Sequence, residues 1–479
     1  MKAGLDRYFH ITERGSTLAT EIRAGVVTFF AMAYIVILNP LILGTVPDHT
    51  GYRLGIPQVA AATALAAGVM TIAFGLIARY PFGIAAGLGI NTMLAVTMVS
   101  GEGLTWPEAM GLVVIDGVVI VILAVTGFRT AVFQAIPSSM KAAIGVGIGL
   151  FIAMIGLVDS GFVRRVPDTA KTTVPVSLGI DGSISSWPTL VFVLGLIICG
   201  ALVVRNVKGG LFIGIVLTTI IAMIVEAFTH AGPSVLPNGD PNPRGWSLAI
   251  PGIPDSLGGI PDLSIVGHVD VVGAFLRVGA LTATLLVFTL VLANFFDAMG
   301  TMTALGKQGR LVDAEGNLPD LKKALVVEGA GAIVGGAASA SSNTVFADSA
   351  AGVGDGARTG LANVVTGVLF LLAMFLTPLY EIVPIEAAAP VLVVVGAMMI
   401  AQIGDIEWTR FDIALPAFLT IVVMPFTYSI ANGIGVGFIS FTLMSVAAGK
   451  ARHVHWIMWL VSALFVVFFA ADPIMDVLG

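Results

Sequence analysis

The sequence predicts an all-α membrane protein that crosses the bilayer about 14 times, as two inverted repeats of seven spans. Three observations lead to this prediction. Hydrophobic residues make up 57% of the 479 residues and charged residues only 11%, whereas soluble domains carry roughly 25% charged residues. Apolar segments of span length recur along the chain. Two of them, in corresponding places of the two halves, are interrupted by glycines and other small residues.

Segments of about 17–25 apolar residues are expected to cross the bilayer as helices. The first half holds seven, near 20–44, 57–78, 83–99, 108–127, 138–157, 188–205 and 209–228. A polar stretch rich in Pro and Gly, from His230 to Arg277, is expected to be an exposed loop. The second half holds eight, near 281–305, 323–338, 345–357, 361–379, 386–402, 411–427, 430–447 and 454–472. Residues 411–447 form either two full spans or two half-length segments.

Basic residues in the short loops predict the orientation, because cytoplasmic loops carry an excess of Lys and Arg. Four basic residues precede the first span, and further ones recur on the same predicted side: Lys2, Arg7, Arg14, Arg23, Arg79, Arg129, Lys141, Arg205, Lys208, Lys307, Arg310, Lys322 and Lys323. Arg164, Arg165 and Lys171 run against the rule. We therefore expect a multi-pass protein of the plasma membrane with a cytoplasmic N-terminus.

The two interrupted spans predict where a ligand binds. The first runs from Pro81 through Phe82 to Asn91, and the second from Gly335 to Gly352, roughly 255 residues apart. Irregular backbone at membrane depth is tolerated only where it is buried in protein or lines a cavity. Each half-helix after a break points its positive N-terminal end at that cavity. The second break also carries Ser, Asn, Thr and Asp, which packing against lipid does not explain.

Two carboxylates inside predicted spans are the leading site residues. Ionisable groups at the centre of a spanning helix cost at least ~2.5 kcal/mol and mark functional sites by default. Asp297 is the only charged residue between Arg277 and Lys307, and Asp348 opens the half-helix after the second break. Both are expected to bind substrate and to take part in proton coupling. A structural N-cap is an alternative role for Asp348, compatible with binding.

Further residues of the same segments complete the predicted substrate site. The Asn91 amide can both donate and accept hydrogen bonds, as a base edge requires, and Phe346 can stack on a planar ligand, although core packing explains it equally well. The remaining candidates for substrate contact are Phe82, Thr301, Thr344 and Ala347.

No catalytic residue is expected. The six histidines lie outside the clear spans without metal-ligand spacing, and Cys199 has no partner cysteine. No phosphate-binding loop for ATP is present. No metal or cofactor is therefore expected beyond a coupling proton, or another cation.

Several motifs, in order along nearly the whole chain, resemble one family. They are Thr28–Pro40, Pro81–Asn91, Phe296–Thr301, Asp348–Val353 with Gly356–Gly360, and Ala389–Ala397. The sequence looks like the nucleobase–cation symporters of the nucleobase–ascorbate superfamily, specifically the AzgA-like adenine/guanine/hypoxanthine permease branch. The resemblance implies short strands at the breaks of the third and tenth spans, with the base bound between them. It also implies that Asp297, Asp348 and Asn91 match the family's eighth-span carboxylate, tenth-span acid and third-span Asn.

The resemblance further implies a core domain and a gate domain, each built from both halves. The core takes residues 1–135 (spans 1–4) and 280–382 (spans 8–11). The gate takes residues 136–230 (spans 5–7) and 383–479 (spans 12–14), and residues 231–279 form an extramembrane loop. Three departures touch the predicted pocket. Asp348 stands where the family usually has Glu, Phe346 where it has Tyr, and the segment Ala85–Asn91 lacks the family's proline.

The sequence therefore predicts a secondary transporter that imports a purine base by proton symport with alternating access. Its partners would be the small purine and the lipid bilayer, with no nucleic acid, and it is a possible homodimer. An alternative is the same fold carrying another nucleobase (uracil or xanthine) or an anion, although two carboxylates would repel an anion. A membrane-embedded enzyme that uses paired aspartates is a further alternative, which the repeat disfavours because an enzyme needs no alternating access.

Overall fold

The computed structural model describes residues 2–127, 136–165, 176–236, 240–247, 249–253, 256–313 and 318–470. Within these ranges nine helices are long and apolar enough to cross a bilayer, and four apolar helices are shorter. The prediction of a helical protein rich in spanning segments is confirmed. Arg129 and Lys171, used above for the orientation, and residues 471–479 lie outside the described ranges.

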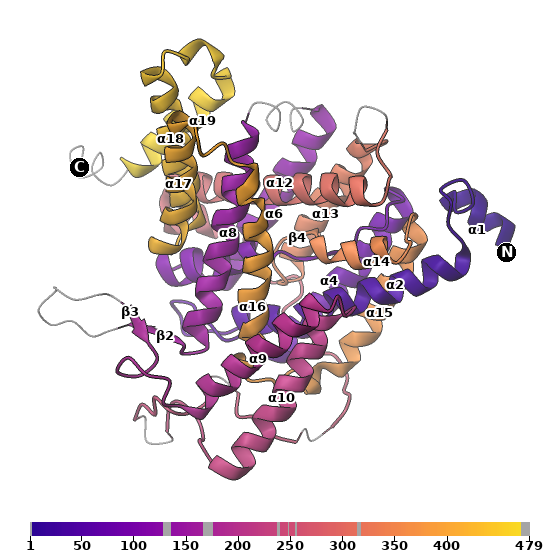
Figure 1. Ribbon diagram of the computed structural model, residues 1–479, viewed down its shortest axis with the longest axis vertical. Helices are drawn as coiled ribbons and strands as arrows, with labels where there is room; N and C mark the ends of the chain where they lie inside the picture. Colours follow the sequence, from indigo (N-terminus) through magenta and orange to yellow (C-terminus); the bar gives the residue numbers. More distant parts are fainter. Residues whose placement is uncertain are drawn as a thin grey trace, which may run out of the picture.

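The first half starts with a short helix, α1 (Lys2–Phe9), at the edge of the molecule (Figure 1). The next two helices, α2 (Leu18–Met32) and α3 (Ile35–Leu43), form one continuous span because the two linking residues keep helical φ and ψ. The other long helices of this half are α4 (Ile56–Ile77), α6 (Trp106–Thr126), α8 (Ser138–Asp159), α9 (Trp187–Val204) and α10 (Gly210–Thr229). A hairpin of β2 (Val163–Arg165) and β3 (Val176–Leu178) follows α8.

The second half begins after the predicted loop, whose end forms the short helix α11 (Gly273–Arg277). Its helices are α12 (Gly279–Gln308), α13 (Leu321–Ala337), α14 (Ala350–Gly354), α15 (Gly360–Ala373), α16 (Ile385–Ile400), α17 (Phe411–Phe426), α18 (Ile430–Ala447) and α19 (Trp456–Phe469). Short 3-10 turns continue two of them, η3 (Met374–Leu379) after α15 and η4 (Ala401–Asp405) after α16. A third, η5 (Ala451–His453), precedes α19.

Polar residues and proline mark several helix starts. Thr105, Ser186, Thr359 and Ser429 each accept a hydrogen bond from a backbone N–H in the first turn of α6, α9, α15 and α18. These caps satisfy donors that have no partner inside the helix. Proline also occupies the first turn of α4, α6 and α9, where its missing N–H costs nothing.

The predicted breaks in the third and tenth spans contain the expected strands. The strands β1 (Ile84–Ala86) and β4 (Asn343–Val345) pair antiparallel, with Ala85 opposite Thr344 at the centre of the ladder. The first strand continues into α5 (Leu88–Thr92) and a π-helical segment, η1 (Met93–Gly101), and the second into η2 (Ala347–Ser349) and α14. Pairing satisfies backbone groups that would otherwise be costly inside a membrane.

The packing of helices repeats between the two halves. The helix α4 packs on α15 as α13 packs on α6, and α8 packs on α17 as α16 packs on α9. Likewise α9 lies against α10 as α17 lies against α18. These contacts match the elements from α2 to α10 with those from α12 to α18, so α17 and α18 correspond to α9 and α10, and α19 stands outside the repeat. Both helices fall among the shorter apolar helices and not among the nine candidate spans, so whether each crosses the bilayer fully stays open. In Figure 1, α8 and α16 run side by side through the middle of the molecule.

Glycine permits the closest helix crossings. A Cβ added to Gly149 of α8 would lie 2.9 Å from the carbonyl oxygen of Gly396 on α16. A Cβ added to Gly117 of α6 would lie at the same distance from the carbonyl oxygen of Gly329 on α13. Small residues at such crossings let helices associate through backbone packing, since lipid offers no hydrophobic drive for association.

Two polar regions lie at opposite ends of the spans. At the N-terminal face, a guanidinium nitrogen of Arg14 donates to the backbone carbonyl of Arg358 at 3.1 Å. Asp355, at the end of α14, pairs with Lys208 from the α9–α10 link and with Arg23 of α2 at 2.7 Å. These contacts connect the N-terminal segment, the second break and the α9–α10 link.

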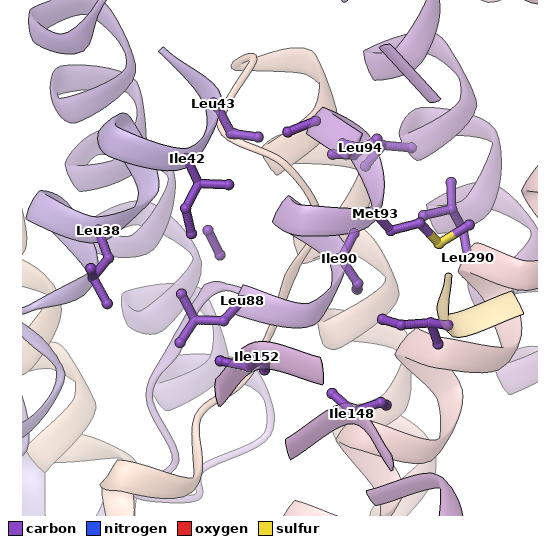
Figure 2. Close-up of a cluster of buried hydrophobic side chains, with 14 of the residues drawn as sticks. Leu38, Ile42, Leu43, Leu88, Ile90, Met93, Leu94, Ile148, Ile152 and Leu290 are labelled. Atoms are coloured by element: carbon purple, nitrogen blue, oxygen red, sulfur yellow. The ribbon is translucent and has the colours of Figure 1, made fainter. Parts of the chain in front are cut away.

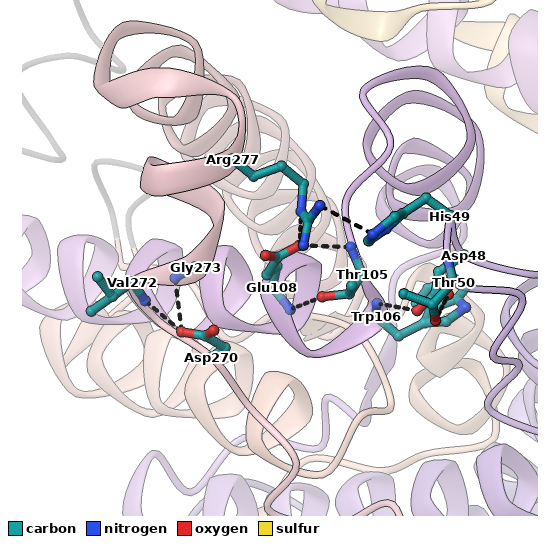
Figure 3. Close-up of polar contacts among 10 residues, drawn as sticks. All are labelled: Asp48, His49, Thr50, Thr105, Trp106, Glu108, Asp270, Val272, Gly273 and Arg277. Atoms are coloured by element: carbon teal, nitrogen blue, oxygen red, sulfur yellow. Dashed lines mark hydrogen bonds and ion pairs between the residues drawn. The ribbon is translucent and has the colours of Figure 1, made fainter.

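The other region, here called the far face, joins the long loop to the start of α6 (Figure 3). Arg277 donates to Glu108 at 2.7 Å, and its second nitrogen lies 3.1 Å from a ring nitrogen of His49. Burial alone would raise the pKa of Asp48, but hydrogen bonds from Thr50, Tyr52 and Trp106 outweigh it and hold that pKa below its ordinary value.

Candidate functional site

A cavity of about 150 Å³ lies between the β1–β4 crossing and the helices α8, α12 and α16. Both predicted carboxylates, Asp297 and Asp348, line it. Phe346, Ala347 and Thr301 line it as well. The lining residues come from both interrupted spans, the α2–α3 link, α8, α12, α16, η4 and the start of α18. The cavity is hereafter called the site cavity.

Asp348 is held by a tyrosine from the first span. The hydroxyl of Tyr34, at the α2–α3 link, donates to a carboxylate oxygen of Asp348 at 3.0 Å. Tyr34 itself is only 1% exposed, so little water competes for this hydrogen bond. Its ring also lies 6.2 Å from that of Phe346, centre to centre. The acid and the aromatic ring of the second break are therefore both positioned by Tyr34.

Asp297 stands on one stripe of α12. Ala293, Asp297 and Thr301 follow each other at intervals of four residues, so they share the helix face that lines the cavity. One turn before Asp297, the side-chain nitrogen of Asn294 donates to Asp116 of α6 at 2.7 Å and to Ser342 at 2.5 Å. These two hydrogen bonds tie α12 to α6 and to the second break, which fixes the rotation of α12 about its axis.

The starts of two short helical segments also line the cavity. Residues Gly87 to Ile90 line it where α5 begins, and Ala347 and Asp348 line it where η2 begins. The first N–H groups of a helix have no partner within that helix. The cavity therefore combines carboxylate acceptors with backbone donors, as a heterocycle with both kinds of edge requires.

The wall opposite the two strands comes from α8, α16 and η4. Ile148 and Ile152 of α8, and Val395 and Met399 of α16, supply apolar surface. Gln402, in η4, adds an amide that can donate and accept. A ligand bound in the site cavity would thus contact the two strand breaks and α12 on one side, and α8, α16 and η4 on the other.

A second cavity, of about 560 Å³, connects this site with the N-terminal face. It shares five residues with the site cavity: Ala347, Asp348, Val395, Met399 and Gln402. Its other end is lined by Asn206, Lys208 and Gly354, close to the ion pair of Asp355. The structure therefore has its site accessible from the N-terminal face.

Three residues predicted for the site do not line this cavity. Asn91 is fully buried on α5, and neither of its side-chain polar atoms has a hydrogen-bond partner. Thr344 is 1% exposed at the centre of β4. Phe82 is fully buried, with its ring stacked on that of Tyr80 at 5.3 Å. Direct contact of these three side chains with a ligand stays a prediction.

Sequence reasoning missed Tyr34 and Gln402. Tyr34 belongs to the first-span motif Thr28–Pro40, and a hydroxyl in an otherwise apolar run was the available signal. Gln402 ends a predicted span, where an amide is ordinarily read as an interfacial residue. Only its position in η4 brings it against the site.

Comparison with known proteins decides the family. The model of the permease family (Xan_ur_permease) matches residues 19–436. The chain belongs to this permease family. The chain is 38% identical to the guanine/hypoxanthine permease PbuG of Bacillus subtilis, over 96% of this chain and 98% of that protein. It is 34% identical to the adenine permease AdeP of Escherichia coli, over 97% of this chain and 95% of that protein. The resemblance seen in the sequence is confirmed, and the permease is a transporter and not an enzyme.

Solved structures of low sequence identity share the fold of this permease. The transmembrane domain of the cyanobacterial bicarbonate transporter BicA matches with a TM-score of 0.57 at 16% identity, covering 90% of this chain and 97% of that domain. The murine anion transporter Slc26a9, in its inward-facing state, matches with a TM-score of 0.60 at 12% identity, covering 90% and 69% of the two chains. Among the residues the structure describes, no cluster of His, Cys, Asp and Glu suits a metal ion.

Proposed function

We propose that this permease imports a purine nucleobase by proton symport and binds it in the site cavity. The observation that carries the proposal is the meeting of Asp297, Asp348 and Phe346 in one cavity, with Tyr34 bonded to Asp348. Carboxylates accept hydrogen bonds from the N–H groups of a purine, and an aromatic ring stacks on its face. The relatives named as guanine/hypoxanthine and adenine permeases align over nearly their whole length, which supports the same substrate class.

An anion is the less suitable cargo. No Lys, Arg or His is found among the described residues that line the site cavity, whereas two carboxylates are. Like charges without a compensating partner repel a bound anion in a medium of low dielectric constant. Another nucleobase, uracil or xanthine, remains the second candidate because its N–H and C=O edges suit the same groups. We also propose Asp297 and Asp348 as the carriers of the coupling proton, because they are the carboxylates that line the site cavity.

We also propose that residues 1–135 with 280–382 form a core domain and residues 136–230 with 383–479 a gate domain. The preference of α4, α6, α13 and α15 for one another, and of α8, α9, α16 and α17 for one another, supports this division. A cytoplasmic N-terminus in the plasma membrane is proposed from the basic residues near the N-terminal face, among them Arg14, Lys208 and Arg358.

Uptake of labelled bases tests the proposal. Cells that lack their own purine permeases and express this chain are expected to accumulate adenine, guanine or hypoxanthine, and to stop when a protonophore collapses the proton gradient. Asp297→Asn is expected to abolish uptake while the protein still reaches the membrane. Asp181→Asn, which removes an exposed carboxylate in a loop residue of positive φ, is the matched control. Accumulation of xanthine or uracil alone, or uptake that survives the protonophore, would contradict the proposed cargo or coupling.

A further inference from the structure

A separate cavity of about 210 Å³ lies toward the far face of the molecule. It is lined by Thr45 and Val46 after α3, by Thr92 and Ala95 of the third span, and by Asp159 at the end of α8. Asp159 is the single carboxylate on its wall among the described residues. Tyr428, in the α17–α18 link, adds a phenol. The cavity is hereafter called the far-face cavity.

The two cavities lie in line along one stripe of α8. Ile148 and Ile152 line the site cavity, and Ile155 and Asp159 line the far-face cavity. The intervals of four, three and four residues place all four side chains on one helix face. Because an α-helix rises 1.5 Å per residue, Asp159 stands about 10 Å beyond Ile152. The same division occurs near the start of α18, where Ile430 lines the site cavity and Tyr428, in the preceding link, lines the far-face cavity.

A layer of aliphatic side chains separates the cavities. It consists of Ile42, Leu88, Ile90, Ile148 and Ile152, none more than 8% exposed. Figure 2 shows these side chains converging from α3, α5 and α8. The helices α3 and α5 belong to the proposed core domain and α8 to the proposed gate domain, so relative movement of the two domains would open the layer. Leu88, Ile90, Ile148 and Ile152 line the site cavity and Ile42 lines the far-face cavity, so the layer lies between the two.

The far-face cavity shares two kinds of group with the site cavity. Each is lined by a carboxylate and a tyrosine among aliphatic side chains: Asp348 and Tyr34, bonded to each other, in one, and Asp159 and Tyr428 in the other. Tyr428 has a φ of 54°, the left-handed conformation that commonly ends a helix, here just after α17, and the backbone N–H of Ser429 closes that turn on the carbonyl of Met424. The ring of Phe151 meets the Tyr428 ring edge-on at 5.5 Å and holds it in place.

The long loop contributes one side of this cavity. The backbone N–H of Ser247, which lines the cavity, donates to a carboxylate oxygen of Glu386 on α16 at 3.0 Å. The neighbouring Trp246 is 1% exposed and donates to Glu226 of α10 at 2.8 Å. The segment of Trp246 and Ser247 is thus anchored to α10 and α16, both in the proposed gate domain, which gives the cavity a defined wall on that side.

We infer that the far-face cavity is a second binding site for the transported purine, at which Asp159 and Tyr428 hold the base while the aliphatic layer is closed. The inference rests on the proposed function, because it assigns the same substrate class to a second position on the pathway. Asp159 accepts from N–H groups of the heterocycle, and the apolar walls contact its faces. The base would reach the site cavity when the layer opens.

Protection of an introduced cysteine tests the inference. Thr45→Cys, in a chain whose single native cysteine is replaced by Cys199→Ser, is labelled with a membrane-impermeant methanethiosulfonate applied to intact cells. The probe ligand is whichever of adenine, guanine or hypoxanthine the wild type accumulates. The measurement is made with Asp297→Asn also present, so that binding in the site cavity does not contribute. The base is expected to slow labelling, and Asp159→Asn to raise the half-protecting concentration about tenfold.

Asp159→Glu, which keeps the carboxylate, is the matched control and is expected to retain protection. Tyr428→Phe keeps the ring and is expected to weaken protection less than Asp159→Asn does. Val46→Cys is a second reporter on the same wall. Absence of protection at both reporters, in a chain whose wild type transports the base, overturns the inference, as does a half-protecting concentration that Asp159→Asn leaves unchanged. A wild type that accumulates no purine would instead overturn the proposed function.

Discussion

Replacing Tyr34 with phenylalanine separates the hydrogen bond at the site from the packing around it. The substitution removes one oxygen and leaves the ring that lies 6.2 Å from Phe346. The lost interaction is the donation to Asp348 at 3.0 Å, from a tyrosine that is 1% exposed. A hydrogen bond to a charged group contributes about 1.5–3 kcal/mol. Since about 1.4 kcal/mol corresponds to a factor of ten, kcat/KM for purine uptake should fall about 10- to 100-fold.

The assay is initial-rate uptake of the labelled base, normalised to the amount of protein at the membrane. Tyr52→Phe removes a hydroxyl from a residue that is 48% exposed in the loop of the far face, and it serves as the control. Its kcat/KM should stay within about twofold of the wild type, because a solvated hydroxyl loses little. A Tyr34→Phe variant with wild-type kcat/KM would refute the argument that Tyr34 positions Asp348, the carboxylate proposed to bind the substrate.

Three further variants test the gate and the two faces. Ile152→Ala should weaken the packing of the aliphatic layer by about 2 kcal/mol. Labelling of a cysteine in the site cavity by a reagent applied from the far face should then accelerate. An unchanged labelling rate would mean that the layer is not the barrier. Asp355→Asn removes the partner of Lys208 and should alter the uptake rate by about two- to fivefold, with no added effect of Lys208→Gln in the double variant. Arg277→Gln breaks the bond to Glu108 and should lower the unfolding midpoint in detergent by about 1–3 °C without changing the KM for uptake.

Much of the fold follows from composition and spacing alone. Apolar runs of span length marked nearly every long helix, because hydrocarbon admits only segments whose backbone groups are bonded internally. The two small-residue breaks were visible for the same reason, since irregular backbone in that setting needs a protein-lined cavity. Asp297 and Asp348 stood out because a carboxylate in an apolar run is costly. Both line the site cavity.

The positions of side chains around the cavity depended on tertiary packing. Asn91 and Phe82 share a break with residues that line the site cavity, but both are fully buried and do not line it themselves, so whether they contact a ligand stays a prediction. Tyr34 reaches Asp348 across more than 300 residues of sequence only because the first and tenth spans lie together. A single chain pattern carries no signal for such a contact.

The sequence by itself determined a two-fold repeated membrane transporter with acidic residues inside its spans, because hydrophobicity and the cost of buried charge act locally along the chain. The correspondence of α17 and α18 with α9 and α10 was decided by which helices they pack against. The continuity of the site cavity with the N-terminal face, and the aliphatic layer that closes it from the far-face cavity, were likewise decided by the tertiary structure. Those features arise between the proposed core and gate domains, and the contacts between these domains join residues distant in sequence.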